Sequence, residues 1–562
     1  MSLLRAPAQA ARHFVTTPDR LVWLGILLAA AAYIQVLRFD FIYDDLFLIL
    51  INPNLDHWSS WTRAFTEHVW AFKEPPVAPR HYRPLFVLWL LVNKRLFDGV
   101  APWWHLTSLL LHLLATLLVY RVGARVVKSE WTAALAAVLF AVHPVHIESV
   151  AWLSVATDLL TAVFLLAATL FYFRFRELGK PWLLAASLIM AAAAILCKET
   201  AAMFPAVIFI FESLQEPRAG VVARIGRALP FGVVVLLYLA ATRLAIPVRA
   251  ISAADADGLT ILASLPLVAV GYLKTLAFPF QLSFFYPPEA LSRWTPAQAL
   301  AVLLLVLVLL ALVWLARSVP IARFPLAWLA VFSIPPLASI ALYTRDNWVH
   351  DRHMYLPSVG FCLLLALVLA RLQPRARWFA GVGLVAVLTA ALALQLPRFD
   401  NELSLYAHAM RRAPFNLELR LVHAYALTMH GQDERAVAEY EAITRFAPHS
   451  EDAHFNLGMD YEQLGRLPAA RAALFRAVVL ARPGSNLRTE ALFRLGSVEL
   501  RLGDLDSAER HLREAIALDP NGWNFHATLA EVLRQKGSSA EAAEELKREE
   551  AARRRQIVRR HR

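Results

Sequence analysis

Charged residues are scarce in this sequence. Only 18% of its 562 residues are Asp, Glu, Lys or Arg, whereas 58% are hydrophobic. Ordinary soluble domains carry about 25% charged residues. This shortage excludes a typical soluble globular protein, and the long apolar runs predict an integral membrane protein instead.

Cysteine is also nearly absent. Cys197 and Cys362 lie far apart, in or beside apolar segments, and they offer neither a disulfide framework nor a zinc-binding spacing. A cleavable signal peptide is not expected either, because the polar stretch 6–20 runs into a long apolar segment without a convincing cleavage site. We interpret that first segment as a membrane anchor.

The apolar segments predict a polytopic helix bundle with about 11 spans, since a transmembrane helix needs about 20 apolar residues. Two further stretches, 85–97 and 260–280, are short or broken by Pro266 and Pro279. We expect them to be interfacial or re-entrant helices. The predicted spans are 21–37, 105–124, 131–147, 150–173, 181–197, 200–214, 228–246, 297–316, 324–343, 353–371 and 378–396.

The basic residues between these spans support the assignment. With the N-terminus inside, Arg and Lys clusters fall in every predicted inside loop, as the positive-inside rule requires. Topology therefore explains the net charge of +12 more simply than nucleic-acid binding does. The same assignment places the acidic and histidine-rich loops, and the C-terminal region, outside the cytosol.

A second region begins after Pro397, where the sequence becomes polar and rich in alanine. We predict a transmembrane domain over 1–397 and a tetratricopeptide-repeat (TPR) domain over 398–562. Glycines and prolines recur there at spacings of 34 to 38 residues, close to the 34-residue TPR period. Stacked helix pairs of this kind form an α-solenoid. The recurring residues are Gly431, Gly465, Gly503 and Gly537, with Pro414, Pro448, Pro483 and Pro520.

Two adjacent carboxylates, Asp44 and Asp45, follow the first predicted span. Acids at a membrane face suit a catalytic base that acts where a lipid-borne substrate meets a soluble one. We favour Asp44, which directly follows Tyr43, as the base. The alternative is that the pair merely begins a solvated loop.

A second candidate cluster combines His143, His146 and Glu148 between two strongly apolar segments, with Asp158 about three turns further on. Ionisable groups at this depth are costly unless they face a cavity or each other, so a functional site is the default hypothesis. Two histidines and a glutamate could bind zinc, but the spacing is not that of a zinc-binding helix. We favour hydrogen bonding to a sugar or a phosphate.

Cations stand near the ends of other predicted spans. Arg83 and Arg352 suit the bidentate binding of phosphate oxygens, and Tyr355 adds a hydroxyl. Lys198 and Glu199 form either an internal ion pair or a phosphate contact. A snorkelling interfacial arginine is an equally good interpretation of Arg83.

With these motifs assembled, the chain resembles the transmembrane and TPR O-mannosyltransferases, a family of the C-type glycosyltransferase superfamily, in a bacterial-type member. One segment departs from the family pattern: Val155 to Asp158 stands where the family often has Gly-Arg-Ala-Asp, which leaves the sugar and the acceptor open. The matching segments are Tyr43-Asp44-Asp45 with Asn52-Pro53, Tyr82 to Leu85, His105 to His112, Phe140 to Ala151, Lys198-Glu199, Arg352 with Tyr355 to Ser358, and the repeats.

This resemblance implies an all-α enzyme that moves a sugar, usually mannose, from a polyprenyl-phosphate donor with inversion. The catalytic residues would be Asp44 and Asp45, and the hydroxyl acceptor would be Ser or Thr of a protein held by the repeats. The donor-binding residues would be Arg83, His143, His146, Glu148, Lys198, Glu199, Arg352 and Tyr355.

Partners and location follow from the same interpretation. The expected partners are the lipid-linked donor, an acceptor polypeptide and the bilayer, with no nucleic acid, no firmly expected cofactor and a divalent metal not favoured. Ala- and Arg-rich usage suggests a bacterial inner membrane with periplasmic repeats. The alternatives are a transferase that acts on lipid or glycan, and a non-enzymatic TPR membrane scaffold.

Overall fold

The computed structural model describes residues 17–73, 81–246, 258–286, 296–341 and 349–560. The elements in these ranges are helices and turns, without a strand. The chain divides into two compact units, Met1–Arg412 and Ala413–Arg562. The prediction of an all-helical protein is therefore confirmed, whereas the predicted domain boundary at Pro397 stays a prediction.

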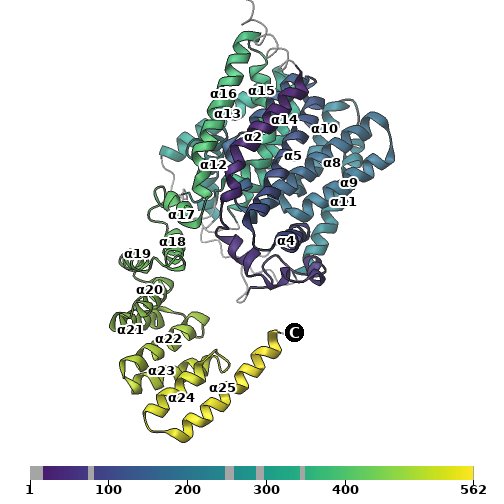
Figure 1. The fold of residues 1–562 in the computed structure, drawn as a ribbon. Helices are drawn as coiled ribbons and strands as arrows, with labels where there is room; N and C mark the ends of the chain where they lie inside the picture. Colours follow the sequence, from purple (N-terminus) through teal and green to yellow (C-terminus); the bar gives the residue numbers. More distant parts are fainter. Residues whose placement is uncertain (1–16, 74–80, 247–257, 287–295, 342–348, 561–562) are drawn as a thin grey trace, which may run out of the picture. The chain divides into compact units, whose positions relative to one another are not determined.

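The first unit is a bundle of apolar helices (Figure 1). By length and composition, the described residues contain nine helices able to cross a membrane, or ten if one bent pair forms a single span. The prediction of about 11 spans agrees with this architecture. The α-helices are α2 (Pro18–Tyr33), α3 (Arg63–Thr66), α4 (Pro84–Phe97), α5 (Ala101–Val127), α6 (Glu130–Ala141), α7 (Ile147–Ala151), α8 (Ala156–Leu178), α9 (Pro181–Cys197), α10 (Phe204–Gln215), α11 (Val221–Ala245), α12 (Gly258–Ala277), α13 (Pro296–Ser318), α14 (Arg323–Ser339), α15 (Tyr355–Leu369), α16 (Pro374–Gln395) and α17 (Glu402–Met410).

Helix α12 differs from the sequence-based expectation. Pro266 lies inside a continuous helix of 20 residues that is long and apolar enough to span a membrane. The expected break at Pro266 is therefore wrong. Membrane helices tolerate proline because neighbouring groups satisfy the freed backbone. Helix α4 has only 14 residues, as its short apolar stretch predicted.

The bent pair is formed by α6 and the segment Pro144–Ala151, which meet at 52°. Pro144 begins a 3-10 turn whose first residues are capped by His143, because the Val145 nitrogen donates to its Nδ1 atom. Helix α7 then ends at Ala151, and the 3-10 turn η6 (Leu153–Val155) leads into α8. The helical direction therefore changes at the break between α6 and Pro144, within the segment that carries the predicted histidine cluster.

The second unit consists of paired helices, as the repeats predicted. Gly431, Gly465, Gly503 and Gly537 all adopt a positive φ, between 68° and 85°, in the turns that the 34-residue spacing marked. Gly458 lies so close to Leu474 that a Cβ atom would approach its side chain to 2.6 Å. The helices are α18 (Leu417–Met429), α19 (Asp433–Phe446), α20 (Glu451–Gln463), α21 (Leu467–Leu480), α22 (Asn486–Leu502), α23 (Leu505–Leu518), α24 (Phe525–Gln535) and α25 (Ser539–Arg560).

Candidate active site

The segment from Glu148 to Asp158 connects most of the predicted site residues. Four of its side chains, Glu148, Trp152, Ser154 and Asp158, are buried, and their partners come from three different parts of the chain. Glu148 binds Arg352, and Asp158 binds Lys198. Trp152 and Ser154 contact the first loop. These four residues lie on α7, on the 3-10 turn η6, between those two elements, and at the start of α8.

Asp45 is anchored to this segment. Its Oδ1 atom accepts hydrogen bonds from the Ser154 backbone nitrogen at 2.7 Å and from the Ser154 hydroxyl, and Oδ2 accepts from the Ile42 nitrogen at 3.3 Å. Burial raises the pKa of Asp45 to about 7, although the Ser154 and Ile42 bonds oppose the shift. The neighbouring Asp44 is only partly buried. The two acids therefore occupy different environments: one is fixed in the interior, and the other is open to solvent.

Tyr43, the residue before the two acids, has an unusual backbone conformation. Its φ of 50° lies in the left-handed region, which is costly for a residue with a side chain. The Tyr43 nitrogen donates to Glu402 Oε1 at 2.9 Å, and the ring makes edge contacts with Trp152 and Phe284. Strained residues held by several contacts are typical of functional sites.

Arg352 is held against the same segment. Its backbone nitrogen donates to Glu148 Oε2 at 2.9 Å, its guanidinium donates to Glu148 Oε1, and the guanidinium carbon lies 4.9 Å from the Trp152 ring centroid. The charge is therefore oriented by a carboxylate and by an aromatic face.

Two further ion pairs lie nearby. Arg83 donates two hydrogen bonds to Glu199, at 3.0 and 2.6 Å, and Lys198 Nζ lies 2.7 and 2.8 Å from the Asp158 oxygens. Burial lowers the pKa of Lys198; Asp158 opposes this shift, whereas Arg83 and Arg352 add to it. The last two effects require closeness, so the structure brings the three predicted cations together.

The predicted residues His143, His146 and Tyr355 are brought together in the interior, where all three are buried. His146 Nε2 lies 2.8 Å from the Ser358 hydroxyl, and the Tyr355 hydroxyl lies 2.8 Å from Nδ1 of His112. His143 Nε2 donates to the Leu276 carbonyl at 3.0 Å. Their contacts here are internal, and their role in donor binding stays a prediction.

Sequence reasoning missed several residues that this geometry makes prominent. Trp152 and Ser154 were not singled out, because a tryptophan and a serine in an apolar stretch carry no signal of their own. Glu402 was missed because it lies beyond the predicted end of the transmembrane domain. Only its contact with Tyr43 reveals it.

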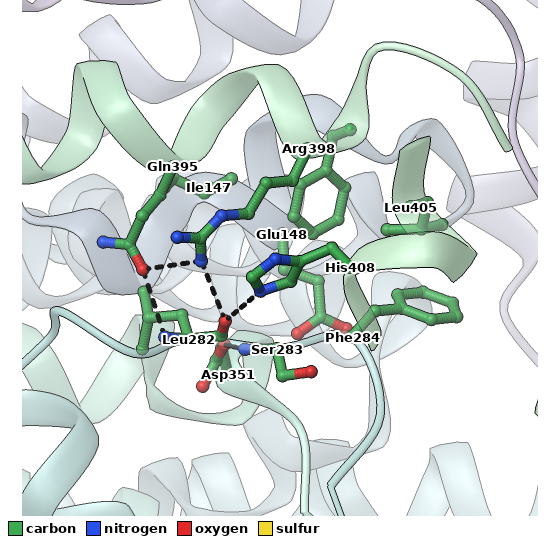
Figure 2. Close-up of a pocket in the computed structure, with 11 residues that line it drawn as sticks. Ile147, Glu148, Leu282, Ser283, Phe284, Asp351, Gln395, Arg398, Leu405 and His408 are labelled. Atoms are coloured by element: carbon green, nitrogen blue, oxygen red, sulfur yellow. Dashed lines mark hydrogen bonds between the residues drawn. The ribbon is translucent and has the colours of Figure 1, made fainter. Parts of the chain in front are cut away.

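A small pocket opens beside Glu148 (Figure 2). Figure 2 shows the loop at Leu282 lying against Arg398 and His408, which both donate to the Leu282 carbonyl, at 3.2 and 3.3 Å. Phe284 lines this pocket and also packs against Tyr43, with ring centroids 5.3 Å apart. The pocket is thus connected to the first loop. Its lining residues are Ile147, Glu148, Leu282, Ser283, Phe284, Asp351, Gln395, Arg398, Phe399, Leu405 and His408.

The chain matches two kinds of known sequence family. Residues 82–246 match the dolichyl-phosphate-mannose-protein mannosyltransferase family, and residues 450–521 and 493–556 match tetratricopeptide repeats. Arg83, Glu148, Lys198 and their partners Asp158 and Glu199 all lie within the first match. The match therefore covers much of the candidate site but not the first-loop acids.

Several curated proteins are similar to this chain. Protein O-mannosyl-transferase Tmtc2 of Drosophila melanogaster is 35% identical over 285 residues, which cover 48% of this chain and 30% of that protein. Protein O-mannosyl-transferase TMTC3 of Homo sapiens is 23% identical over 579 residues, which cover 93% and 63%. Protein O-mannosyl-transferase F38B6.6 of Caenorhabditis elegans is 26% identical, with coverages of 75% and 62%. The chain thus spans 30% to 63% of the length of these relatives.

Among solved structures, an oligosaccharyltransferase of Archaeoglobus fulgidus aligns with 68% of this chain and 56% of its own, at 12% identity and a TM-score of 0.36, which supports no argument. The sequence matches and the helical bundle define a multi-pass membrane protein with a mannosyltransferase-type domain followed by TPR repeats. The chain is similar, over its membrane part and its repeats, to proteins named protein O-mannosyl-transferases.

Proposed function

We propose that the protein is a membrane glycosyltransferase that moves a sugar, mannose, from a polyprenyl-phosphate donor to a Ser or Thr hydroxyl of a polypeptide. One observation carries the proposal: the segment Glu148 to Asp158 directly contacts Asp45, the neighbour of the proposed base, and two of the three cations. An acid and several cations around one place suit a reaction that removes a proton and releases a phosphate.

In the proposed reaction, Asp44 takes the proton of the acceptor hydroxyl. The hydroxyl oxygen forms a bond to the anomeric carbon of the sugar from the face opposite the phosphate, so the configuration inverts. The bond between that carbon and the phosphate oxygen breaks, and the polyprenyl phosphate leaves with the electron pair. Asp45, anchored on Ser154, positions its neighbour rather than reacting.

The cations contribute by stabilising the charge on the departing phosphate. Arg352, Lys198 and Arg83 each have an acidic partner, so they are oriented before the donor binds and need little reorganisation during the reaction. No nucleotide site is required, because the donor sugar arrives on a lipid. His143, His146 and Tyr355 form hydrogen bonds inside the bundle and complete the donor-binding region in this proposal.

The repeats select the acceptor polypeptide in this proposal, since stacked helix pairs form extended binding surfaces. The basic inside loops favour an arrangement in which the repeats and the site lie outside the cytosol, in the periplasm of a bacterial inner membrane. The names of the relatives, all protein O-mannosyl-transferases, support the sugar and the acceptor class.

The test is to incubate the purified protein with radiolabelled polyprenyl-phosphate mannose and candidate acceptors, and to find where the label goes. Label on polypeptide Ser or Thr supports the proposal, and label on lipid or glycan supports the alternative transferase. Asp44→Asn should abolish most of the transfer. Asp56→Asn, an exposed acid of the same loop, is the matched control and should transfer at the wild-type rate. If the wild-type protein neither binds the donor nor transfers label to any acceptor, the result would favour the alternative of a non-enzymatic TPR scaffold.

A further inference from the structure

Three arginines gather beside the pocket at Glu148 without an acidic partner. Arg398 lines the pocket, and Arg411 and Arg412 lie close enough to repel its charge. Within the described residues, the hydrogen-bond partners of Arg398 are the Leu282 carbonyl and the Gln395 side chain. Arg411 donates to His408 Nδ1 at 3.0 Å. None of these partners carries a negative charge when His408 is neutral.

This arrangement contrasts with the other cations of the candidate site. Arg83, Lys198 and Arg352 each form an ion pair with a carboxylate. In the part of the chain that the structure describes, no such pair involves the three arginines beside the pocket. Like charges gathered without compensation raise the energy of the folded protein, and an anion would relieve that cost.

The acids that line the pocket balance only part of this positive charge. Both oxygens of Glu148 are engaged by Arg352. Asp351 accepts from the Tyr286 hydroxyl at 2.6 Å and from the Ser283 nitrogen at 3.2 Å. Asp351 accepts only from neutral groups and also attracts Arg398 and Arg412, so on this side of the pocket one acid without an arginine ion pair faces three arginines.

His408 adds a neutral donor and acceptor rather than a further charge. Burial lowers its pKa to about 4, and Arg398 and Arg411 add to the shift, while the bond to the Leu282 carbonyl opposes it. At neutral pH the ring therefore donates through Nε2 to Leu282 and accepts from Arg411 through Nδ1. It holds Arg411 and the loop in place beside Arg398.

We propose that this pocket binds the carboxylate of an Asp or Glu side chain in the acceptor polypeptide, close in sequence to the hydroxyl that receives the sugar. The inference rests on the proposed function and adds a feature of its substrate: an acidic residue beside the acceptor site. Arg398 is the main contact, and Arg411 and Arg412 supply the surrounding positive potential.

The position of the pocket favours a peptide over an anionic lipid headgroup. Phe284 lines the pocket and packs on Tyr43, the residue before the proposed base. Extended peptide spans at most about 3.3–3.6 Å per residue, so a chain with its hydroxyl at Asp44 reaches a neighbouring site with a residue a few positions away.

The experiment uses the full chain in nanodiscs of zwitterionic lipid with pairs of fluorescent peptides that differ only by Glu or Gln near the acceptor Ser. A charge-assisted hydrogen bond predicts that kcat/KM is about ten-fold to a hundred-fold higher for the Glu peptide. Arg398→Gln should reduce kcat/KM for the Glu peptide to that of the Gln peptide measured with the same variant, whereas Arg398→Lys, which keeps the charge, should retain part of the preference. Arg412→Gln should reduce the preference partly.

Arg377→Gln is the matched control, since Arg377 is exposed near the other end of α16, and it should keep the full preference. Equal use of both peptides by the wild type, or a preference that survives Arg398→Gln, would overturn the inference. The inference would also be overturned if Arg398→Gln changed only the binding of anionic lipid, and peptide binding in zwitterionic nanodiscs stayed the same. Peptide binding measured by fluorescence anisotropy without donor separates the two proposals: Arg398-dependent binding of the Glu peptide without any sugar transfer would keep this inference and refute the proposed reaction.

Discussion

Asp45 Oδ1 lies 2.7 Å from the backbone nitrogen of Ser154, a residue 109 positions further along the chain. This contact joins the first loop to the turn between α7 and α8. The buried Asp45 is fixed by this contact, whereas Asp44 is only partly buried; in the proposed reaction Asp44 is the base.

The first prediction separates these roles. Asp45→Ala leaves the Ser154 nitrogen and hydroxyl without their buried partner, so we expect a loss of about 1–3 kcal/mol in the free energy of unfolding. Asp44→Asn should leave the thermal midpoint unchanged and lower turnover by about 10² to 10⁴-fold, the usual contribution of a general base. Thermal unfolding in detergent and initial rates measure the two effects. Wild-type turnover in Asp44→Asn and in Asp45→Asn, singly and together, would refute the assignment of the active centre.

The second prediction concerns pH. Burial raises the folded-state pKa of Asp45 to about 7 from the ordinary value of 3.8, so the folded protein binds this proton more tightly than the unfolded chain. Its contribution to stability is therefore largest below about pH 4 and is lost as the pH rises towards 7. Asp45→Asn has no such proton, so the wild type should lose stability relative to Asp45→Asn across this window. Parallel pH curves for the two proteins would contradict the shifted pKa.

The fold was predictable from the sequence where the signal is local or periodic. The repeats could be recognised because each turn needs a residue that adopts a positive φ. Glycine fills that position in every repeat, at Gly431, Gly465, Gly503 and Gly537, so the glycine spacing shows the period. The apolar segments gave the helices of the bundle. Pro266 misled the prediction for 258–277, since a proline looks like a break in sequence but is accommodated inside a helix of the bundle.

The site was predictable only as a set of separate residues. Asp45 was recognised as one of two acids, but its partner Ser154 lies 109 residues away and is an unremarkable residue type. Arg352 and Glu148 were each singled out, yet nothing in their sequence context indicates that they pair across 204 residues. Such pairings depend on how helices pack, which spacing along one segment does not encode.

The third prediction tests the buried pair of Lys198 and Asp158. Removing one partner leaves the other charge buried, so Asp158→Asn and Lys198→Met should each destabilise the protein by about 3–5 kcal/mol. The double variant should recover much of this loss and still bind the lipid-linked donor more weakly, because the phosphate contact is missing. Lys180→Met, an exposed lysine before α9, is the control. Wild-type donor affinity in a folded double variant would remove Lys198 from the donor site.

The fourth prediction concerns Arg352, which is oriented by Glu148 and by the face of Trp152. A phosphate contact exists before the reaction and strengthens as the leaving group gains charge, so Arg352→Ala should weaken both donor binding and turnover. Arg352→Lys keeps the charge but loses the planar fork and should fall between Ala and wild type. Donor titration and single-turnover rates separate the two effects. A variant that loses turnover at unchanged donor affinity would show that Arg352 acts only in the transition state.

The last prediction locates the end of the part that binds donor. The Asp40 nitrogen donates to the Asp400 carbonyl at 2.9 Å, and Glu402 accepts from the Tyr43 nitrogen, so residues after Arg398 hold the first loop. We therefore expect a chain ending at Arg412 to bind polyprenyl-phosphate sugar as the full chain does, whereas a chain ending at Arg398 should lose the conformation of the first loop. In the full chain, Glu402→Ala should lower turnover while donor affinity stays nearly unchanged, since the strained backbone of Tyr43 loses its partner. Glu402→Gln keeps an acceptor oxygen and serves as the control. Loss of donor binding in a folded chain ending at Arg412 would show that the repeats complete the donor site.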